Sequence, residues 1–324
     1  MGIFDKRVTI EPVEYPVALQ FVDAINQSMW FHTEWSFQAD IQDYKVKLTP
    51  KERNIVKKSL LAIAQIEVSV KKFWAKLPDI MDKPEFGDVG YSFAESEVRH
   101  KRAYKHLLTI MGIDNEFESL LNVPEIQMRI EYLSKYLKGA GSNAQERYTL
   151  TLALFSLFTE NVSLFSQFLI VKSFNQHKKV LKDIDNAVQA TQKEETIHAL
   201  FGAYLITEIR KEFPEWFNDE FVAKFQRACK KAYDAELGII KWIYAEGELE
   251  WLTFKQLDEF LKHRFNESMA MINIPPIFEV DYEVLKSLDW FLTELTVQVA
   301  PDFFNKKSVN YTKNTKPITS DDLF

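Results

Sequence analysis

Apolar residues recur along most of this chain at intervals of three, four and seven positions, which is the spacing of one face of an α-helix. We therefore predict helices near residues 17–30, 50–74, 92–111, 126–137, 144–171, 177–211, 216–244 and 253–271, followed by two short turns around 282–296. Thr49-Pro50-Lys51-Glu52 has the form of a capping box with proline at the first helical position, so the second helix is predicted to begin there.

The composition agrees with a helical chain. Only 9 glycines and 11 prolines occur in 324 residues, which favours long helices over a strand-rich fold. No repeat or composition break is apparent before Pro301, and the last residues are polar and aperiodic. We predict one all-α domain over residues 1–304 and a flexible tail over residues 305–324.

The most apolar segment, residues 148–171, is long enough to cross a membrane. It contains Glu160, Asn161 and Gln167, and a central carboxylate is unfavourable in lipid. The segment is therefore predicted to be a helix in the core of a large protein, with no membrane partner.

Charge and cysteine content restrict the function further. The formal net charge of -7 argues against a nucleic-acid surface, and Cys229 is the single cysteine, which excludes an intrachain disulfide framework. No P-loop sequence occurs, and the first residues lack the apolar core of a signal peptide. A cytoplasmic location is the simplest expectation.

Carboxylates occupy core positions on four of the predicted helices. Glu67 lies on a stripe with Leu60 and Ile63, Glu97 on another, Glu160 on a third and Glu195 on a fourth. His100 and His198 follow Glu97 and Glu195 by three residues, and no other histidine follows a carboxylate at that spacing. One Glu-x-x-His pair alone is more often an ordinary surface or core feature than a metal site. Four stripes together point to metal.

Buried carboxylates need compensating cations, and no lysine or arginine is apparent on these stripes. Two divalent metals would balance four carboxylates, with the imidazoles as neutral ligands, and a donor set rich in oxygen and free of thiolate suits iron or manganese. The pattern is that of ferritin-like helical bundles, in which a dinuclear site lies between four core helices. The predicted ligands are Glu67, Glu97, His100, Glu160, Glu195 and His198.

These residues also lie in segments that resemble the small, radical-generating subunit of class I ribonucleotide reductase. The segments are EVRHKRAY at 97–104, TENV at 159–162 and KEETIH at 193–198, and the resemblance extends along nearly the whole chain. In that family, the tyrosine at the position of Tyr104 is oxidised to a stable radical. The resemblance thus implies an oxidoreductase subunit that activates oxygen at its metals. The alternative for Tyr104 is an ordinary core tyrosine with a hydrogen-bonded hydroxyl, which is the commoner role of a buried tyrosine.

The same family passes an electron to its large subunit through a buried tryptophan and a tail tyrosine. Trp30 is the better match for that tryptophan and Trp35 the alternative, while Tyr311 is the tail candidate. Glu194 stands where the family usually has an aspartate bonded to a metal-binding histidine. The acidic and apolar end, residues 321–324, is suited to docking on the large subunit.

The sequence leaves the identity of the metals, the partners and two alternative functions open. Glu67 stands where many members have aspartate, and glutamate also occurs there in members with a manganese–iron centre that lack the tyrosine, so Fe/Fe, Mn/Mn and Mn/Fe are all possible. The resemblance implies a homodimer and allows an activating flavoprotein. The alternatives are a stand-alone di-metal oxidase or oxygenase and a ferritin-like iron store.

Overall fold

The computed structural model describes residues 2–68, 70–139 and 144–304, and no strand occurs among them. The longer elements are α1 (Pro16–Gln27), α3 (Pro50–Glu67), α6 (Pro84–Met111), α8 (Pro124–Gly139), α9 (Gln145–Leu154), η4 (Phe155–Ser163), α10 (Phe165–Lys178), α11 (Lys182–Glu212), α12 (Asp219–Ile243), α13 (Phe254–Ala270) and α15 (Asp289–Phe304). The shorter ones are η1 (His32–Glu34), α2 (Gln38–Gln42), η2 (Asp43–Lys47), α4 (Lys71–Ala75), α5 (Leu77–Ile80), η3 (Asp114–Glu116), α7 (Phe117–Leu120), η5 (Pro214–Phe217), α14 (Tyr282–Leu285) and η6 (Lys286–Leu288).

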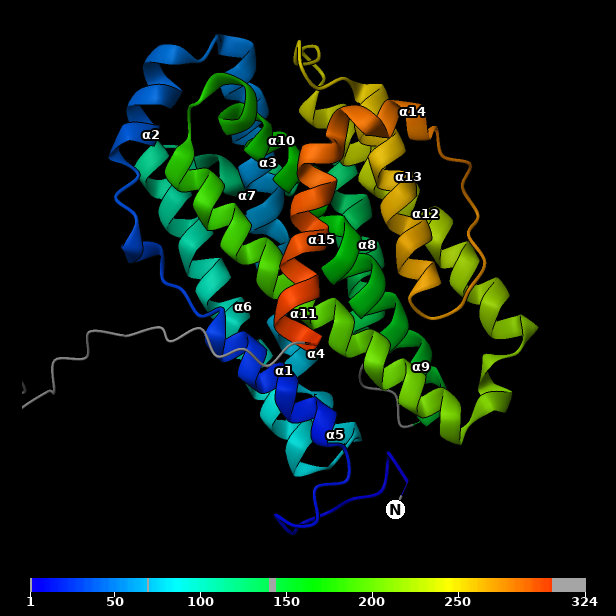
Figure 1. The fold of residues 1–324 in the computed structure, drawn as a ribbon. Helices are drawn as coiled ribbons and strands as arrows, with labels where there is room; N and C mark the ends of the chain where they lie inside the picture. Colours follow the sequence, from blue (N-terminus) through cyan, green and yellow to red (C-terminus); the bar gives the residue numbers. More distant parts are fainter. Residues whose placement is uncertain (1, 69, 140–143, 305–324) are drawn as a thin grey trace, which may run out of the picture.

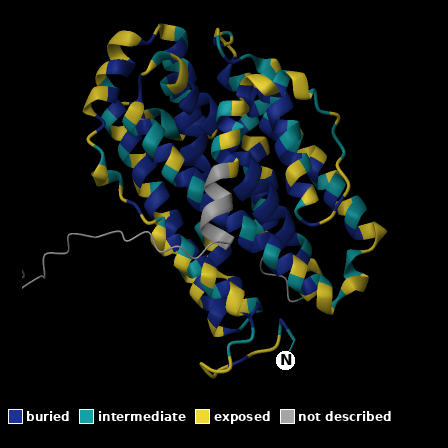
Figure 2. Cartoon of the chain, viewed as in Figure 1, coloured by how far each residue is buried: buried dark blue, intermediate teal, exposed yellow. Residues whose placement is uncertain are grey.

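Four long segments form the centre of the bundle (Figure 1): α3, α6, the run from α9 through η4 to α10, and α11. α11 packs on η4 and α10, and α3 packs on α6 and α10. Their facing sides are buried, and the exposed residues lie on the outside of the bundle (Figure 2). The predicted all-α, ferritin-like architecture is therefore confirmed.

Local sequence explains where α3 begins. The side chain of Thr49 accepts a hydrogen bond from the backbone N–H of Glu52 at 3.3 Å, and the Glu52 carboxylate accepts one from the N–H of Thr49 at 2.8 Å. Two N–H groups without helical partners are thus satisfied reciprocally. The predicted capping box is confirmed.

The predicted helix over 50–74 is interrupted near its end. α3 ends at Glu67, and the short helix α4 begins at Lys71. Val68 and Val70 lie between the two helices, and β-branched valine is a poorer helix former than alanine or glutamate.

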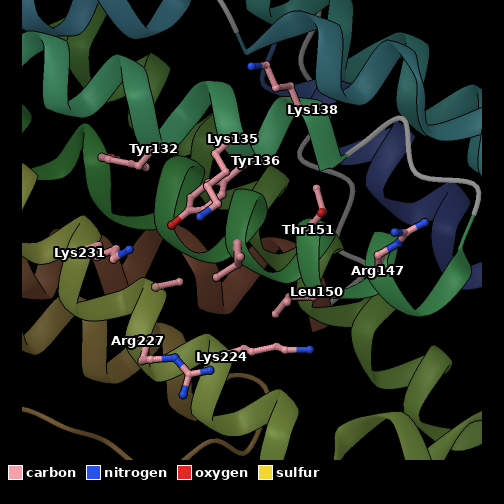
Figure 3. A pocket seen from close by; sticks show the side chains of 12 residues that line it. Tyr132, Lys135, Tyr136, Lys138, Arg147, Leu150, Thr151, Lys224, Arg227 and Lys231 are labelled. Carbon is pink, nitrogen blue, oxygen red and sulfur yellow. The ribbon is translucent and has the colours of Figure 1, made fainter.

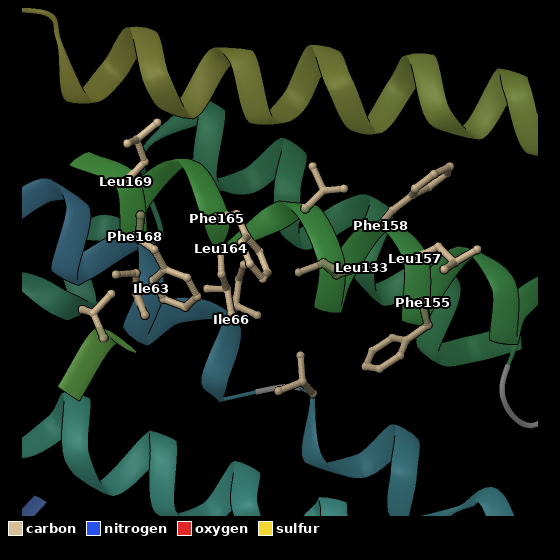
Figure 4. Packing of buried hydrophobic residues seen from close by; sticks show 14 of the residues in the cluster. Ile63, Ile66, Leu133, Phe155, Leu157, Phe158, Leu164, Phe165, Phe168 and Leu169 are labelled. Atoms are coloured by element: carbon tan, nitrogen blue, oxygen red, sulfur yellow. The ribbon is translucent and has the colours of Figure 1, made fainter. Parts of the chain in front are cut away.

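The most apolar segment is buried, as predicted. The helical run Gln145–Lys178 is long and apolar enough to cross a membrane, but every residue of its apolar window is buried against other helices. Figure 4 shows its side chains, among them Phe158 and Phe165, packed with Ile63 of α3 and Leu133 of α8. It has the environment of a core helix.

The middle of this run, η4, is a π-helix, whose wider turn was not predicted. π-Helical turns inside α-helices are frequent at functional sites. A Cβ atom at Gly202 of α11 would lie 2.1 Å from the Cβ and Oγ atoms of Ser156, so glycine is required for η4 and α11 to approach this closely. The contact fixes two of the central elements against each other.

The end of the described chain also differs from expectation. Two short turns were predicted around 282–296, but only α14 and η6 are short, and α15 is a helix of 16 residues. Phe291 packs against Phe260 of α13 with ring centroids 5.6 Å apart, so tertiary contact stabilises a segment with little helical periodicity of its own.

Candidate metal centre

The predicted ligand residues converge in the middle of the bundle. Glu67 is the last residue of α3, Glu97 and His100 lie on α6, Glu160 lies on η4, and Glu195 and His198 lie on α11. All six side chains are 0–1% exposed. Four elements that are distant in sequence thus direct carboxylates and imidazoles at one point.

The six residues form two overlapping groups. One consists of Glu67, Glu97, His100 and Glu195, and the other of Glu97, Glu160, Glu195 and His198. Within each group, one ligand atom from every residue lies within 4.8 Å of the others. Glu97 and Glu195 belong to both groups, so each would contribute to holding both ions.

Both imidazoles present Nδ1 to the carboxylates. Nδ1 of His100 lies 3.0 Å from an oxygen of Glu195 and 3.7 Å from oxygens of Glu67 and Glu97. Nδ1 of His198 lies 3.1 Å from Glu97 and 3.3 Å from Glu195. Each imidazole therefore faces one of the two groups.

The opposite ring nitrogens are held by other residues. Nε2 of His100 lies 2.7 Å from the Glu194 carboxylate, and Nε2 of His198 lies 3.0 Å from Oγ of Ser96. The Ser96 hydroxyl donates to the carbonyl of Phe93, so its oxygen is free to accept from His198. These contacts favour the tautomer with the proton on Nε2, which leaves the Nδ1 lone pair for a metal.

Several ligand atoms have no hydrogen-bond partner among the described residues. They are both oxygens of Glu67, both oxygens of Glu97, one oxygen of Glu195 and Nδ1 of His100. Buried acceptors without partners are unfavourable by about 1–3 kcal/mol each, more when charged. Divalent cations would satisfy them, and the donors, oxygens with two imidazoles, fit iron or manganese.

The shifted pKa values of the cluster also indicate a site that favours cations. Burial raises the pKa of Glu67 and of Glu160 well above the usual range for a carboxyl, and neighbouring carboxylates add to it. Burial would lower the pKa of His100 and of His198, but the facing carboxylates outweigh it and raise both. The cluster therefore attracts positive charge, as protons or as metal.

Tyr104 lies one turn after His100 on α6 and is 1% exposed. Its hydroxyl donates to Oγ1 of Thr191 on α11 at 3.1 Å. Burial raises the pKa of the phenol, and the charge of Glu67 raises it further, so the hydroxyl stays protonated. A neutral, dry phenol thus lies beside the ligand group that contains Glu67.

Trp30 lies against the cluster on the side of His100. The two rings are stacked with centroids 5.9 Å apart and an interplanar angle of 22°. The indole N–H of Trp30 has no hydrogen-bond partner among the described residues, so it does not donate to Glu194. Trp35 instead contacts Trp30 and Phe37.

Arg99 was not predicted as a site residue from the sequence. It connects Trp30 with Glu194. Its guanidinium donates to the backbone carbonyl of Trp30 at 3.2 Å and to the Glu194 carboxylate at 3.1 Å. Ser28 also donates to Glu194, at 3.2 Å. Glu194 thus contacts the cationic Arg99 in addition to the imidazole of His100. Arg99 is adjacent to His100 in sequence, but its orientation could not be inferred from spacing.

Trp74 was also missed as a site residue. Its indole Nε1–H donates to Oε1 of Glu160 at 2.8 Å, and its ring lies 5.9 Å from that of His198. Gly90 of α6 makes room for this residue, because a Cβ atom there would lie 2.7 Å from the carbonyl oxygen of Trp74. Trp74 orients a carboxylate of the second ligand group.

We expect Trp74→Phe to weaken metal binding in the group with His198 by about 10- to 100-fold, because outer hydrogen bonds orient ligands. Manganese titration against a chelator would measure it. Trp35→Phe is the matched control, since Trp35 contacts no predicted ligand in the described structure. Unchanged affinity in Trp74→Phe, or equal losses in both variants, would count against this role.

Two predictions lie outside the described residues. Tyr311 and the docking segment 321–324 both fall within residues 305–324. They remain predictions from the sequence.

Comparison with known proteins gives consistent results. The family model described as "Ribonucleotide reductase, small chain" matches residues 7–285. A "Probable ribonucleoside-diphosphate reductase small subunit 048L" of Invertebrate iridescent virus 3 is 23% identical over 95% of this chain and 85% of its own length. The "Ribonucleoside-diphosphate reductase subunit beta" of Chlamydia pneumoniae is 22% identical over 93% of this chain and 88% of its own.

Solved structures share the fold. The ribonucleotide reductase R2 subunit from Clostridium botulinum superposes with a TM-score of 0.80 at 15% identity, covering 88% of this chain and 90% of that one. The dimanganese(II)-NrdF of Streptococcus sanguinis superposes with a TM-score of 0.74 at 15% identity, covering 88% of this chain and 100% of that one.

Proposed function

This chain belongs to the ribonucleotide reductase small-chain family, and we propose that it generates a radical on Tyr104 at a dinuclear metal centre and relays it to a large subunit. The observation that supports this most directly is the position of a buried phenol beside two overlapping groups of metal-ligating side chains. The chain is the small subunit of an oxidoreductase, and the radical step is the proposal.

In this proposal, Glu67, Glu97, His100 and Glu195 hold one metal ion, and Glu97, Glu160, Glu195 and His198 hold the other. The metals would be Fe/Fe, Mn/Mn or Mn/Fe. When bound, such a pair supplies the oxidising power, with oxygen or a reduced oxygen species, that removes one electron and one proton from a phenol. An activating flavoprotein would supply the reduced species where manganese is used.

The surroundings of Tyr104 favour a long-lived radical. The ring is 1% exposed, and its hydroxyl contacts Thr191, whose own hydroxyl donates to the carbonyl of Ala187. Thr191 holds the phenol oxygen in place. Exclusion of water protects a radical at this position from reduction by solutes.

We propose Trp30 as the outward relay, with His100 and Glu194 between it and the metals. The stacked contact of Trp30 with His100 supports this, as does the hydrogen bond between His100 and Glu194. Arg99 fixes the geometry by bonding both Glu194 and the carbonyl of Trp30. Tyr311 in the tail would pass the oxidising equivalent from Trp30 to the large subunit.

The partners in this proposal are a second copy of the chain and the large subunit, with the tail, residues 305–324, docking on the latter. Ending the chain after Phe304 keeps every described helix, and we expect it to weaken large-subunit binding by at least about tenfold, or 1.4 kcal/mol. Surface plasmon resonance would measure the affinity, and deoxyribonucleotide formation the activity.

Tyr311→Phe separates docking from relay. We expect it to bind the large subunit normally but to stop ribonucleotide reduction, because phenylalanine cannot be oxidised in place of tyrosine. A truncated chain that still oxidises a substrate alone would favour the stand-alone oxidase or oxygenase. Uptake of iron well beyond two ions per chain would favour a store.

A further inference from the structure

A basic hollow lies on the bundle between α8, α9 and α12 (Figure 3). Its volume is about 690 Å³, within the range of ligand pockets in proteins. Six cationic side chains line it, from three helices: Lys135, Lys138, Arg147, Lys224, Arg227 and Lys231. It is separate from the metal ligands, none of which lines it.

The charge of the hollow is unlike that of the chain. The protein carries a formal net charge of -7, yet no aspartate or glutamate is among the lining residues. Lys224 pairs with Glu220 at 2.7 Å, whereas the other five cations have no carboxylate within 4.0 Å in the described part of the chain. Five cations without a close carboxylate give a concentrated positive field, and such a field attracts anions.

The cations are arranged by helix geometry. Lys224, Arg227 and Lys231 are spaced by three and four on α12, and Lys135 and Lys138 are spaced by three on α8, so each set shares one helix face. Like charges at these spacings repel and are slightly destabilising. An anion in the hollow would remove that repulsion from two helices at once.

The floor of the hollow is apolar and partly aromatic. Tyr132, Tyr136 and Leu154 line it and are only 5–8% exposed. The two tyrosine rings lie 5.5 Å apart at 54°. A flat ring could pack on this floor while its charged groups meet the cations at the rim.

Buried hydrogen bonds hold the floor in place. The hydroxyl of Tyr132 bonds Oγ of Ser163 at 2.6 Å and donates to Glu236, which is also paired with the fully buried Arg129. Arg129 donates further to the carbonyls of Ala62 and Ser163, at 2.9 and 3.1 Å. The hydroxyl of Tyr132 is therefore held by buried partners, and its ring is fixed in the lining of the hollow before any ligand binds.

We propose that this hollow binds a nucleotide, with the polyphosphate held by the α8, α9 and α12 cations and the base packed on Tyr132 and Tyr136. The ligand class follows from the combination of a cationic rim and an apolar, aromatic floor. The phosphates are held by side chains here, so no P-loop is needed.

The site can be tested by calorimetric titration of the metal-loaded full chain with adenosine triphosphate, inorganic triphosphate and adenosine. We expect adenosine triphosphate to bind most tightly, inorganic triphosphate more weakly, and adenosine not measurably. Equal binding of the two triphosphates would overturn the aromatic part, and no binding of either would overturn the site.

Variants locate the binding. Arg227→Glu with Lys231→Glu should weaken adenosine triphosphate binding by at least about tenfold, because two attractions become repulsions. Lys230→Glu with Lys241→Glu is the matched control: it makes the same total charge change on α12, but neither residue lines the hollow. Equal weakening by the control would reduce the site to general surface charge and overturn it.

A further variant tests the floor. Tyr136→Leu keeps an apolar side chain but removes the ring, and should weaken adenosine triphosphate without changing inorganic triphosphate. Thermal unfolding would verify that each variant is folded. If an acidic peptide bound at the hollow more tightly than adenosine triphosphate, the small-molecule assignment would be wrong.

Discussion

Replacing Tyr104 by phenylalanine is expected to remove the stable organic radical from the metal-loaded, oxygen-exposed protein. Phenylalanine fills the same buried space but has no hydroxyl proton to lose, so it is not oxidised under these conditions. Electron paramagnetic resonance would show a narrow radical signal in the wild type and none in the variant. Ribonucleotide reduction with the large subunit should fall to background in parallel.

Tyr148 offers a matched control for this experiment. It is also 1% exposed, but its hydroxyl has no hydrogen-bond partner among the described residues. Tyr148→Phe should therefore keep the full signal. A signal of unchanged shape in Tyr104→Phe would assign the radical to another residue. A wild type with no radical but an active complex would indicate a metal-based oxidant, as in members with a manganese–iron centre.

Substitution of Glu195 by glutamine should have the largest effect on the metals. Glu195 belongs to both ligand groups, so loss of its charge weakens both at once. We expect each metal to bind more than about 100-fold more weakly, beyond the range for outer-sphere changes. Metal analysis after gel filtration should fall from two ions per chain toward none.

Glu67 and Glu160 provide the contrast, because each belongs to one group only. Glu67→Gln and Glu160→Gln should each reduce the content from two ions to one. If all three variants lost metal equally, the assignment of Glu195 to both ions would be incorrect.

Glu236 controls for the loss of a buried carboxylate as such. It is 1% exposed and paired with Arg129, and it belongs to neither ligand group. Breaking a buried ion pair costs about 3–5 kcal/mol. Glu236→Gln should therefore lower the free energy of unfolding while leaving the metal content at two ions.

The helical periodicity of the sequence was enough to place the ligand residues on four core faces. Glu97, His100, Glu195 and His198 share faces because of their spacing within single helices, which is a local property. That the four faces would meet followed from the burial cost of their carboxylates. The architecture and the convergence were therefore predictable.

Features that depend on contacts between elements could not be predicted from the sequence. The hydrogen bond from Trp74 to Glu160 joins residues 86 positions apart, and periodicity within one helix carries no information on such a contact. The bond between Arg99 and Glu194 joins residues 95 positions apart. The basic hollow has a signal in the like charges on α8 and α12, but only the fold places these helices beside each other.

The burial of the ligands determines how a metal can reach them. Each group draws its ligands from three of the four central elements, and both require α6 and α11, so the two groups are complete together only when all four elements have packed. The close contact of Gly202 with Ser156 then holds α11 against η4. A metal ion must therefore enter a bundle that is already closed, through brief local separation of its helices. The speed of metal uptake accordingly reports how often the bundle opens, whereas the retention of metal reports the strength of its ligands.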